Sequence, residues 1–193
     1  MIISYTKDLA ILFDLKLNVT STEKFESIPI LDDWVMACLW NSHEHIALTL
    51  IHRRSLFSLI VISEVKDIPY CISLFNQQLN VLLDEVNLSD KKYKDHFENL
   101  FKHILAVKHD DKGINNAIKH VRDHFLIHES RCIHNGLKIK SIDIVNFANN
   151  RVRKKLDFRK ASEVFYTLVR KHYNEPIIVP ILNDKGIITP TFH

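Results

Sequence analysis

Residues 34–63 read WVMACLWNSHEHIALTLIHRRSLFSLIVIS, and the way this apolar stretch folds decides the class of the whole protein. Polar residues interrupt it at positions 41–45 and 52–55, about three helical turns apart, so they would share one face of a long helix. Asp32 or Asp33 is suited to cap a helix that begins at Trp34. Neither interruption contains Gly or Pro, the residues on which tight turns commonly depend. We therefore predict a helix across this stretch.

The same interruptions also fit turns between three strands, at Val35–Trp40, Ile46–Ile51 and Leu56–Ile62. This alternative is an α+β fold with a hairpin across residues 35–62. The composition favours helices, because only 3 Gly and 5 Pro occur among 193 residues. We predict an all-α fold: a bundle of about five helices with a long motif helix, an irregular N-terminal leader and an extended C-terminal tail.

Helical signals continue downstream of this stretch. Pro69 suits a first helical position, and Ser89 and Ser141 each mark a helix start. A turn at 110–113 precedes the motif helix, and a break near Asp157 separates the last two helical segments. Three prolines among the last 18 residues preclude a helix there. The expected organisation is a leader at 1–30, a helical domain at 31–174 and an extended tail at 175–193.

Composition excludes several classes of protein. The chain is 46% hydrophobic and 25% charged, which is typical of a globular domain rather than a disordered one. Its three cysteines are far apart, so neither a disulfide framework nor a zinc knuckle is indicated. We see no signal peptide and no apolar run of membrane-spanning length, and therefore expect a cytoplasmic location without a membrane partner. Glycine-rich phosphate loops, nucleophile elbows and paired-carboxylate motifs are also missing from the sequence.

The segment Arg122–His128, RDHFLIH, carries the most chemistry. An arginine stabilises an anionic phosphorane, and a histidine transfers protons near neutral pH, so the pair suits phosphodiester cleavage without a metal. Asp123 is the polar residue that follows the arginine. We therefore take Arg122, Asp123 and His128 as candidate catalytic residues, with no cofactor and no metal.

Together with the helical pattern of residues 32–173, this motif resembles the HEPN superfamily, and most closely its abortive-infection and toxin–antitoxin branch. The resemblance implies an all-α homodimer that acts as a metal-independent endoribonuclease, with Arg122 and His128 catalytic and Asp123 supporting. It also implies a toxin or phage-defence effector that cleaves RNA through 2′-hydroxyl attack, with an antitoxin or other regulatory protein as partner. One departure is Ser130, where members that are silenced by nucleotidylation carry tyrosine. The alternative is a non-catalytic helical scaffold that binds a protein or RNA.

Helix geometry places Arg122 and His128 about 120° apart around an ideal helix. One copy of the motif therefore does not bring both side chains to one phosphate, whereas two copies that meet in a homodimer would. We accordingly expect a dimer with a composite site.

Two further patterns concern binding. Residues 151–172 form a basic stripe, from which we take Arg151, Arg153, Lys154 and Lys155 as candidate RNA-binding residues. His120, His124 and His128 recur every four residues on the motif helix, but they span about 12 Å, too far to share one metal ion. We interpret His120 and His124 as packing residues.

Overall fold

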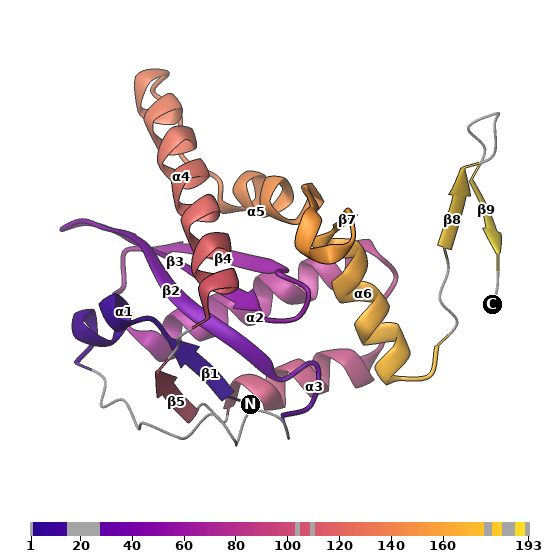
Figure 1. Ribbon diagram of the computed structural model, residues 1–193. Coiled ribbons are helices and arrows are strands. Elements are labelled where there is room, and N and C mark those ends of the chain that lie inside the picture. The colour runs from indigo at the N-terminus through magenta and orange to yellow at the C-terminus, as the bar shows by residue number, and fades with distance from the viewer. Residues whose placement is uncertain are drawn as a thin grey trace.

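The computed structural model describes residues 2–14, 28–102, 105–108, 111–175, 179–182 and 188–191. Helices and strands are mixed along this chain, as Figure 1 shows. In chain order the elements are β1 (Ile2–Tyr5), α1 (Lys7–Leu12), β2 (Asp33–Asn41), β3 (Ile46–His52), β4 (Ser58–Ser63), α2 (Ile68–Glu85), α3 (Lys91–Lys102), β5 (Leu105–Lys108), α4 (Lys112–His134), α5 (Ser141–Asn150), β6 (Val152–Arg153), the 3-10 helix η2 (Lys154–Leu156), β7 (Arg159–Lys160), α6 (Ala161–His172), β8 (Val179–Leu182) and β9 (Ile188–Thr191).

A mixed five-stranded sheet lies at the centre, in the order β4-β3-β2-β1-β5. Strands β2, β3 and β4 form an antiparallel meander, while β1 runs parallel to β2 on one side and to β5 on the other. Strands β6 with β7 and β8 with β9 form two small antiparallel pairs. The all-α prediction is therefore wrong, and the α+β alternative, with antiparallel strands across residues 35–62, fits.

Side chains make the two turns of the meander without glycine. At the first, Ser42 donates its backbone N–H to the carbonyl of His45, whose own N–H reaches the Ser42 hydroxyl. At the second, Leu56 takes a left-handed conformation (φ 57°). Backbone hydrogen bonds from Leu56 to His52 and from His52 to Phe57 close that turn. Within it, the Ser55 N–H donates to Nδ1 of His52 and the Phe57 N–H donates to the Ser55 hydroxyl. The scarcity of glycine wrongly favoured a helix here, because hydrogen bonds to serine and histidine side chains stabilise both turns.

The two faces of the sheet bury different residues of β2. Trp34 and Met36 belong to the larger core, together with Phe75 of α2 and Phe97 of α3. Val35 and Ala37 point the other way and pack with a smaller core that includes Ile114, Ala117 and Ile118 of α4. In Figure 1, α2 and α3 lie behind the sheet, and α4 crosses in front of it and extends beyond it. Each of these strands is apolar along most of its length, because both of its faces are covered.

The predicted starts of the downstream helices are confirmed, although α5 ends at Asn150 and residues 152–156, expected to continue that helix, form β6 and η2. Helices α2, α3, α4, α5 and α6 begin close to the predicted starts. Asp67 caps α2 by accepting from the N–H of Tyr70, and Asp111 caps α4 by accepting from Gly113 and Ile114. The break near Asp157 is a left-handed turn (φ 53°).

The N-terminal prediction needs correction. Residues 2–5, expected in an irregular leader, form β1 between β2 and β5. Residues 105–108, which lie between the predicted helix start at Ser89 and the predicted turn at 110–113, form the edge strand β5 instead of continuing that helix. Within the tail, residues 179–182 and 188–191 are extended strands, and apart from Glu175 its other residues lie outside the described ranges. No helix in the described part of the chain is long and apolar enough to cross a membrane.

Candidate functional site: a basic groove beside α4

Two adjoining pockets that share His120 and Arg153 form a groove between α4 and the short segment that joins α5 to α6, and the pocket beside His124 and Arg151 is narrow, at about 10 Å³. One wall carries His120 and His124 of α4, and the other carries Arg151, Arg153, Lys154 and Lys155. We call these six residues the basic groove. The part around His120, Arg153, Lys154 and Lys155 encloses about 210 Å³. The four candidate RNA-binding residues thus lie together, with Arg151 just before β6, Arg153 in β6 and the two lysines in η2.

A buried leucine holds this basic segment against α4. Leu156 lies in the smaller core with Ile114 and Ala117, and the β6–β7 pair closes the loop around it. The N–H of Phe158 donates to the carbonyl of Arg153 (3.0 Å), which completes the hairpin. The apolar anchor therefore orients the neighbouring lysines and arginines toward the groove.

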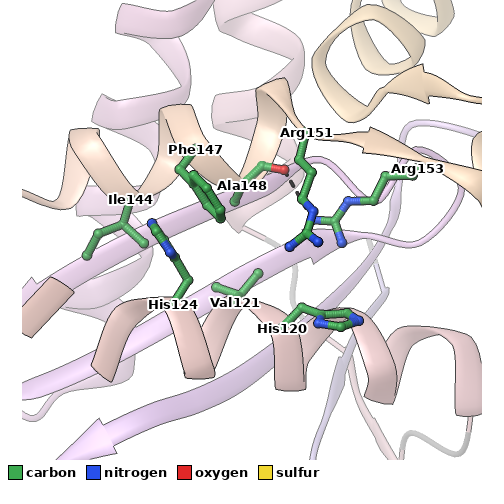
Figure 2. Close-up of a pocket in the computed structure, with 8 residues that line it drawn as sticks. All are labelled: His120, Val121, His124, Ile144, Phe147, Ala148, Arg151 and Arg153. Atoms are coloured by element: carbon green, nitrogen blue, oxygen red, sulfur yellow. Dashed lines mark hydrogen bonds between the residues drawn. The ribbon is translucent and has the colours of Figure 1, made fainter. Parts of the chain in front are cut away.

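Two arginines approach each other with no acidic partner. Arg153 donates to the carbonyl of Ala148 (3.1 Å) near the C-terminus of α5, where the helix dipole favours a cation. Burial and the charge of Arg151 lower the pKa of Arg153. Figure 2 shows the two guanidinium groups next to each other, facing His120 of α4 across the groove. Among the described residues, neither arginine has a carboxylate within ion-pair distance, and the Nε of Arg153 is buried without a partner. This arrangement attracts an anion.

An imidazole stacks on a phenyl ring at the other end of the groove. The rings of His124 and Phe147 lie with centroids 3.4 Å apart and planes at 13°. Burial lowers the pKa of His124, and the charges of His128, Arg131 and Arg151 lower it further. Phe147 remains 44% exposed, so its ring is also accessible from solvent. An imidazole with a lowered pKa and an accessible aromatic ring thus border the arginine pair.

The lysines lie at the opposite end, near the start of α4. The ammonium group of Lys155 lies so close to Gly113 that a side chain at that position would collide with it. Burial raises the pKa of Asp111, but the amides of Ile114 and Gly113, with the charges of Lys155 and Arg53, lower it more. Part of the charge of Lys155 is therefore balanced within the protein, unlike that of the arginine pair.

The three candidate catalytic residues do not converge within this chain. Arg122 donates to the carbonyl of Cys38 (2.7 Å), which lies at a bulge in β2. Asp123 is exposed, and His128 lies beside His124 with its Nε2 3.7 Å from the sulfur of Cys132. Arg122 therefore faces a different side of α4 from His128, as the helix geometry predicted.

Two histidines that were interpreted as packing residues line the groove. His124 packs as predicted, but on the groove-lining Phe147, and His120 is exposed on the groove wall instead of packed. Their spacing of four residues, followed by the basic stretch at 151–155, was the available signal. In the described part of the chain, no group of three His, Cys, Asp or Glu residues is arranged to hold a metal ion.

His52 and Arg53, two of the polar residues that interrupt the apolar stretch 34–63, are part of the interior. His52 is fully buried, with Nε2 2.7 Å from the carbonyl of Ile30. Arg53 forms an ion pair with Asp33 (2.9 Å) and donates to the hydroxyl of Ser4 (3.2 Å). Arg53 thus connects β1 and β2, His52 connects the end of β3 to the segment before β2, and neither side chain lines the groove.

Comparison with protein-family models, with characterised proteins and with solved structures finds no match for this chain.

Proposed function

We propose that this protein binds single-stranded RNA through the basic groove. The observation that carries the proposal is the pairing of Arg151 with Arg153, two cations held together with no carboxylate partner among the described residues. Keeping like charges together costs free energy unless an anion offsets it, and arginine forks match phosphate oxygens. A phosphodiester backbone supplies a series of such anions.

The aromatic end of the groove favours a single strand over a duplex. Bases of a single strand can turn out and stack on aromatic side chains, whereas those of a duplex are already stacked. Phe147, with His124 on one face, provides such a ring next to the arginines. We therefore expect the arginines and lysines to contact the RNA backbone and Phe147 to stack on a base.

A direct test is fluorescence anisotropy with a labelled 12-nucleotide RNA at several salt concentrations. Arg151→Ala, which removes an exposed side chain, is expected to weaken binding several-fold and to reduce the salt slope by about 0.7 per lost phosphate contact. Arg54→Ala, an exposed arginine in the β3–β4 turn, is the matched control and should leave both quantities unchanged. DNA of the same sequence shows whether the 2′-hydroxyl contributes. Equal binding by wild type and Arg151→Ala would contradict the proposal.

Metal-free cleavage of the bound RNA is the second candidate function, and the two groove histidines favour it. His124 has a lowered pKa, so it is suited to accept the proton of a 2′-hydroxyl as that oxygen attacks phosphorus. His120, exposed on the same wall, would donate a proton to the leaving 5′-oxygen. The bond between phosphorus and the 5′-oxygen breaks, which gives a 2′,3′-cyclic phosphate and a 5′-hydroxyl. This histidine pair lies next to Arg151 and Arg153, whereas Arg122 and His128 do not line the groove.

A toxin or phage-defence role, a homodimer and an antitoxin partner remain predictions that rest on the sequence resemblance. A cytoplasmic setting is part of the same proposal and agrees with the free thiols of Cys38, Cys71 and Cys132.

A further inference from the structure

A second polar cleft lies between α1 and α4. It encloses about 330 Å³, within the usual range for small-molecule sites of roughly 300–1,000 Å³. The side chains that line it are Thr6, Lys7, Asp8, Asn115, Ile118, Lys119 and Arg122. Three are cationic and one is anionic, so the cleft favours a negatively charged ligand. None of its residues lines the basic groove.

The strand arrangement explains why a cleft forms here. Strand β1 pairs with β2 only as far as Tyr5 with Met36, and Thr6 then leads into α1. Strand β2 continues to Asn41, so its edge extends past the end of β1. Ligands of sheets with parallel strands commonly bind just beyond the carboxyl ends of those strands. The cleft therefore occupies a position at which this type of architecture tends to bind small molecules.

Two buried polar atoms border the cleft without a hydrogen-bond partner in the described residues. The carbonyl of Cys38 holds one end of the Arg122 guanidinium (2.7 Å), while its Nε is left unpaired. The hydroxyl of Thr6 is also unpaired and makes no capping bond to α1. A buried donor without a partner is unfavourable, so an acceptor that reaches the Nε of Arg122 and the hydroxyl of Thr6 would be stabilising.

From this geometry we infer that the α1–α4 cleft binds a small molecule that carries a phosphate group. A phosphate monoester has about two negative charges at neutral pH and three acceptor oxygens, which suits the Arg122 fork, the Thr6 hydroxyl and the ammonium group of Lys119. Asp8 accepts hydrogen bonds from hydroxyl groups on the rest of the ligand, and its charge disfavours a continuous polyanion. A sugar phosphate has this combination of groups. This site is independent of the RNA-binding proposal.

The test is isothermal titration calorimetry of the full chain with ribose 5-phosphate, inorganic phosphate and ribose. We expect ribose 5-phosphate to bind with a Kd below about 1 mM and ribose not to bind. Arg122→Lys keeps the charge but loses the fork, and is expected to weaken binding at least tenfold. Thr6→Val, which keeps the shape but removes the hydroxyl, should weaken it about threefold to tenfold.

Lys112→Ala removes an exposed lysine of α4 that does not line the cleft, and it should leave the affinity unchanged. Thermal unfolding of each variant confirms that it is folded. If Arg122→Lys is unstable, the affinity of Thr6→Val for ribose 5-phosphate tests the inference in its place. Binding of inorganic phosphate that both cleft variants weaken would support the phosphate subsite. No binding of either phosphate compound, or binding that neither cleft variant changes, would overturn the inference. Arg151→Ala should not affect this titration, so its outcome is separable from that of the RNA experiment.

Discussion

The side-chain amide of Asn149 pairs with both backbone groups of Ser58, which lies 91 residues earlier in the chain. Asn149 accepts from the Ser58 N–H (2.7 Å) and donates to the Ser58 carbonyl (2.8 Å). Two residues further along β4, Gln78 does the same for Ile60, at 2.8 and 2.9 Å. Strand β4 is at an edge of the sheet, so these two amides take the place of a neighbouring strand.

Asn149→Ala is therefore expected to destabilise the fold by about 2–4 kcal/mol, because two buried backbone groups of Ser58 lose their partners. Urea denaturation measures the change in the free energy of unfolding. Asn146→Ala, an exposed asparagine on the same helix, is the control and should change stability by less than about 0.5 kcal/mol. A loss of similar size in both variants would show that edge pairing is not responsible, because alanine has a higher helix propensity than asparagine.

Acid should destabilise the protein through His52. Its Nε2 lies against the Ile30 carbonyl, so Nε2 carries the proton and Nδ1 accepts from Ser55 (2.7 Å). Burial lowers the pKa of His52 from 6.5 to about 4, although the charge of Asp33 opposes part of that shift. The unfolded chain binds the proton below pH 6.5, so stability is fully present above that pH and is lost as the pH falls to about 4.

The expected loss from this group is roughly 3 kcal/mol between pH 7.5 and pH 4. Denaturation curves across this range measure it, and His52→Gln, which retains an uncharged donor, should flatten the dependence. His120→Gln, an exposed histidine, should retain the wild-type profile. An unchanged slope in His52→Gln would assign the acid sensitivity to another group.

Arg53 connects three parts of the fold and is expected to be intolerant of substitution. It pairs with Asp33 at the start of β2 and lies 3.5 Å from the carboxylate of Asp111, the N-cap of α4. Arg53→Met should cost about 3 kcal/mol, because it leaves the nearly buried Asp33 uncompensated. Adding Asp33→Asn to Arg53→Met should restore part of that loss in a double-mutant cycle. Additive losses would argue against direct coupling between the two side chains.

RNA cleavage by histidine variants distinguishes the two candidate catalytic sites, one in the groove and one at Arg122 and His128. With EDTA present, His124→Ala and His120→Ala should each slow cleavage about 10²–10⁴-fold if the groove carries out general acid–base chemistry. His128→Ala, which changes a neighbouring imidazole outside the groove lining, should retain the activity. End-group analysis should find 2′,3′-cyclic phosphates. Loss of cleavage only in His128→Ala and Arg122→Ala would instead support a composite site in a dimer.

Local interactions explain which features were predictable from sequence. The helices after residue 67 follow from short-range capping and apolar periodicity, such as Asp111 before the stripe of Ile114, Ala117 and Ile118. The basic residues at 151–155 were also visible, because charge is a property of the side chains themselves. The poor alignment of Arg122 with His128 followed from helix geometry alone.

Only the tertiary structure decided the class of the fold and the composition of the groove. Residues 34–63 are apolar enough for either a buried helix or buried strands, and the choice depends on distant partners such as β1, Gln78 and Asn149. His120 and His124 likewise join Arg151 and Arg153 only because Leu156 packs under α4. Such contacts join residues that are far apart in the chain, and local periodicity carries no information about them.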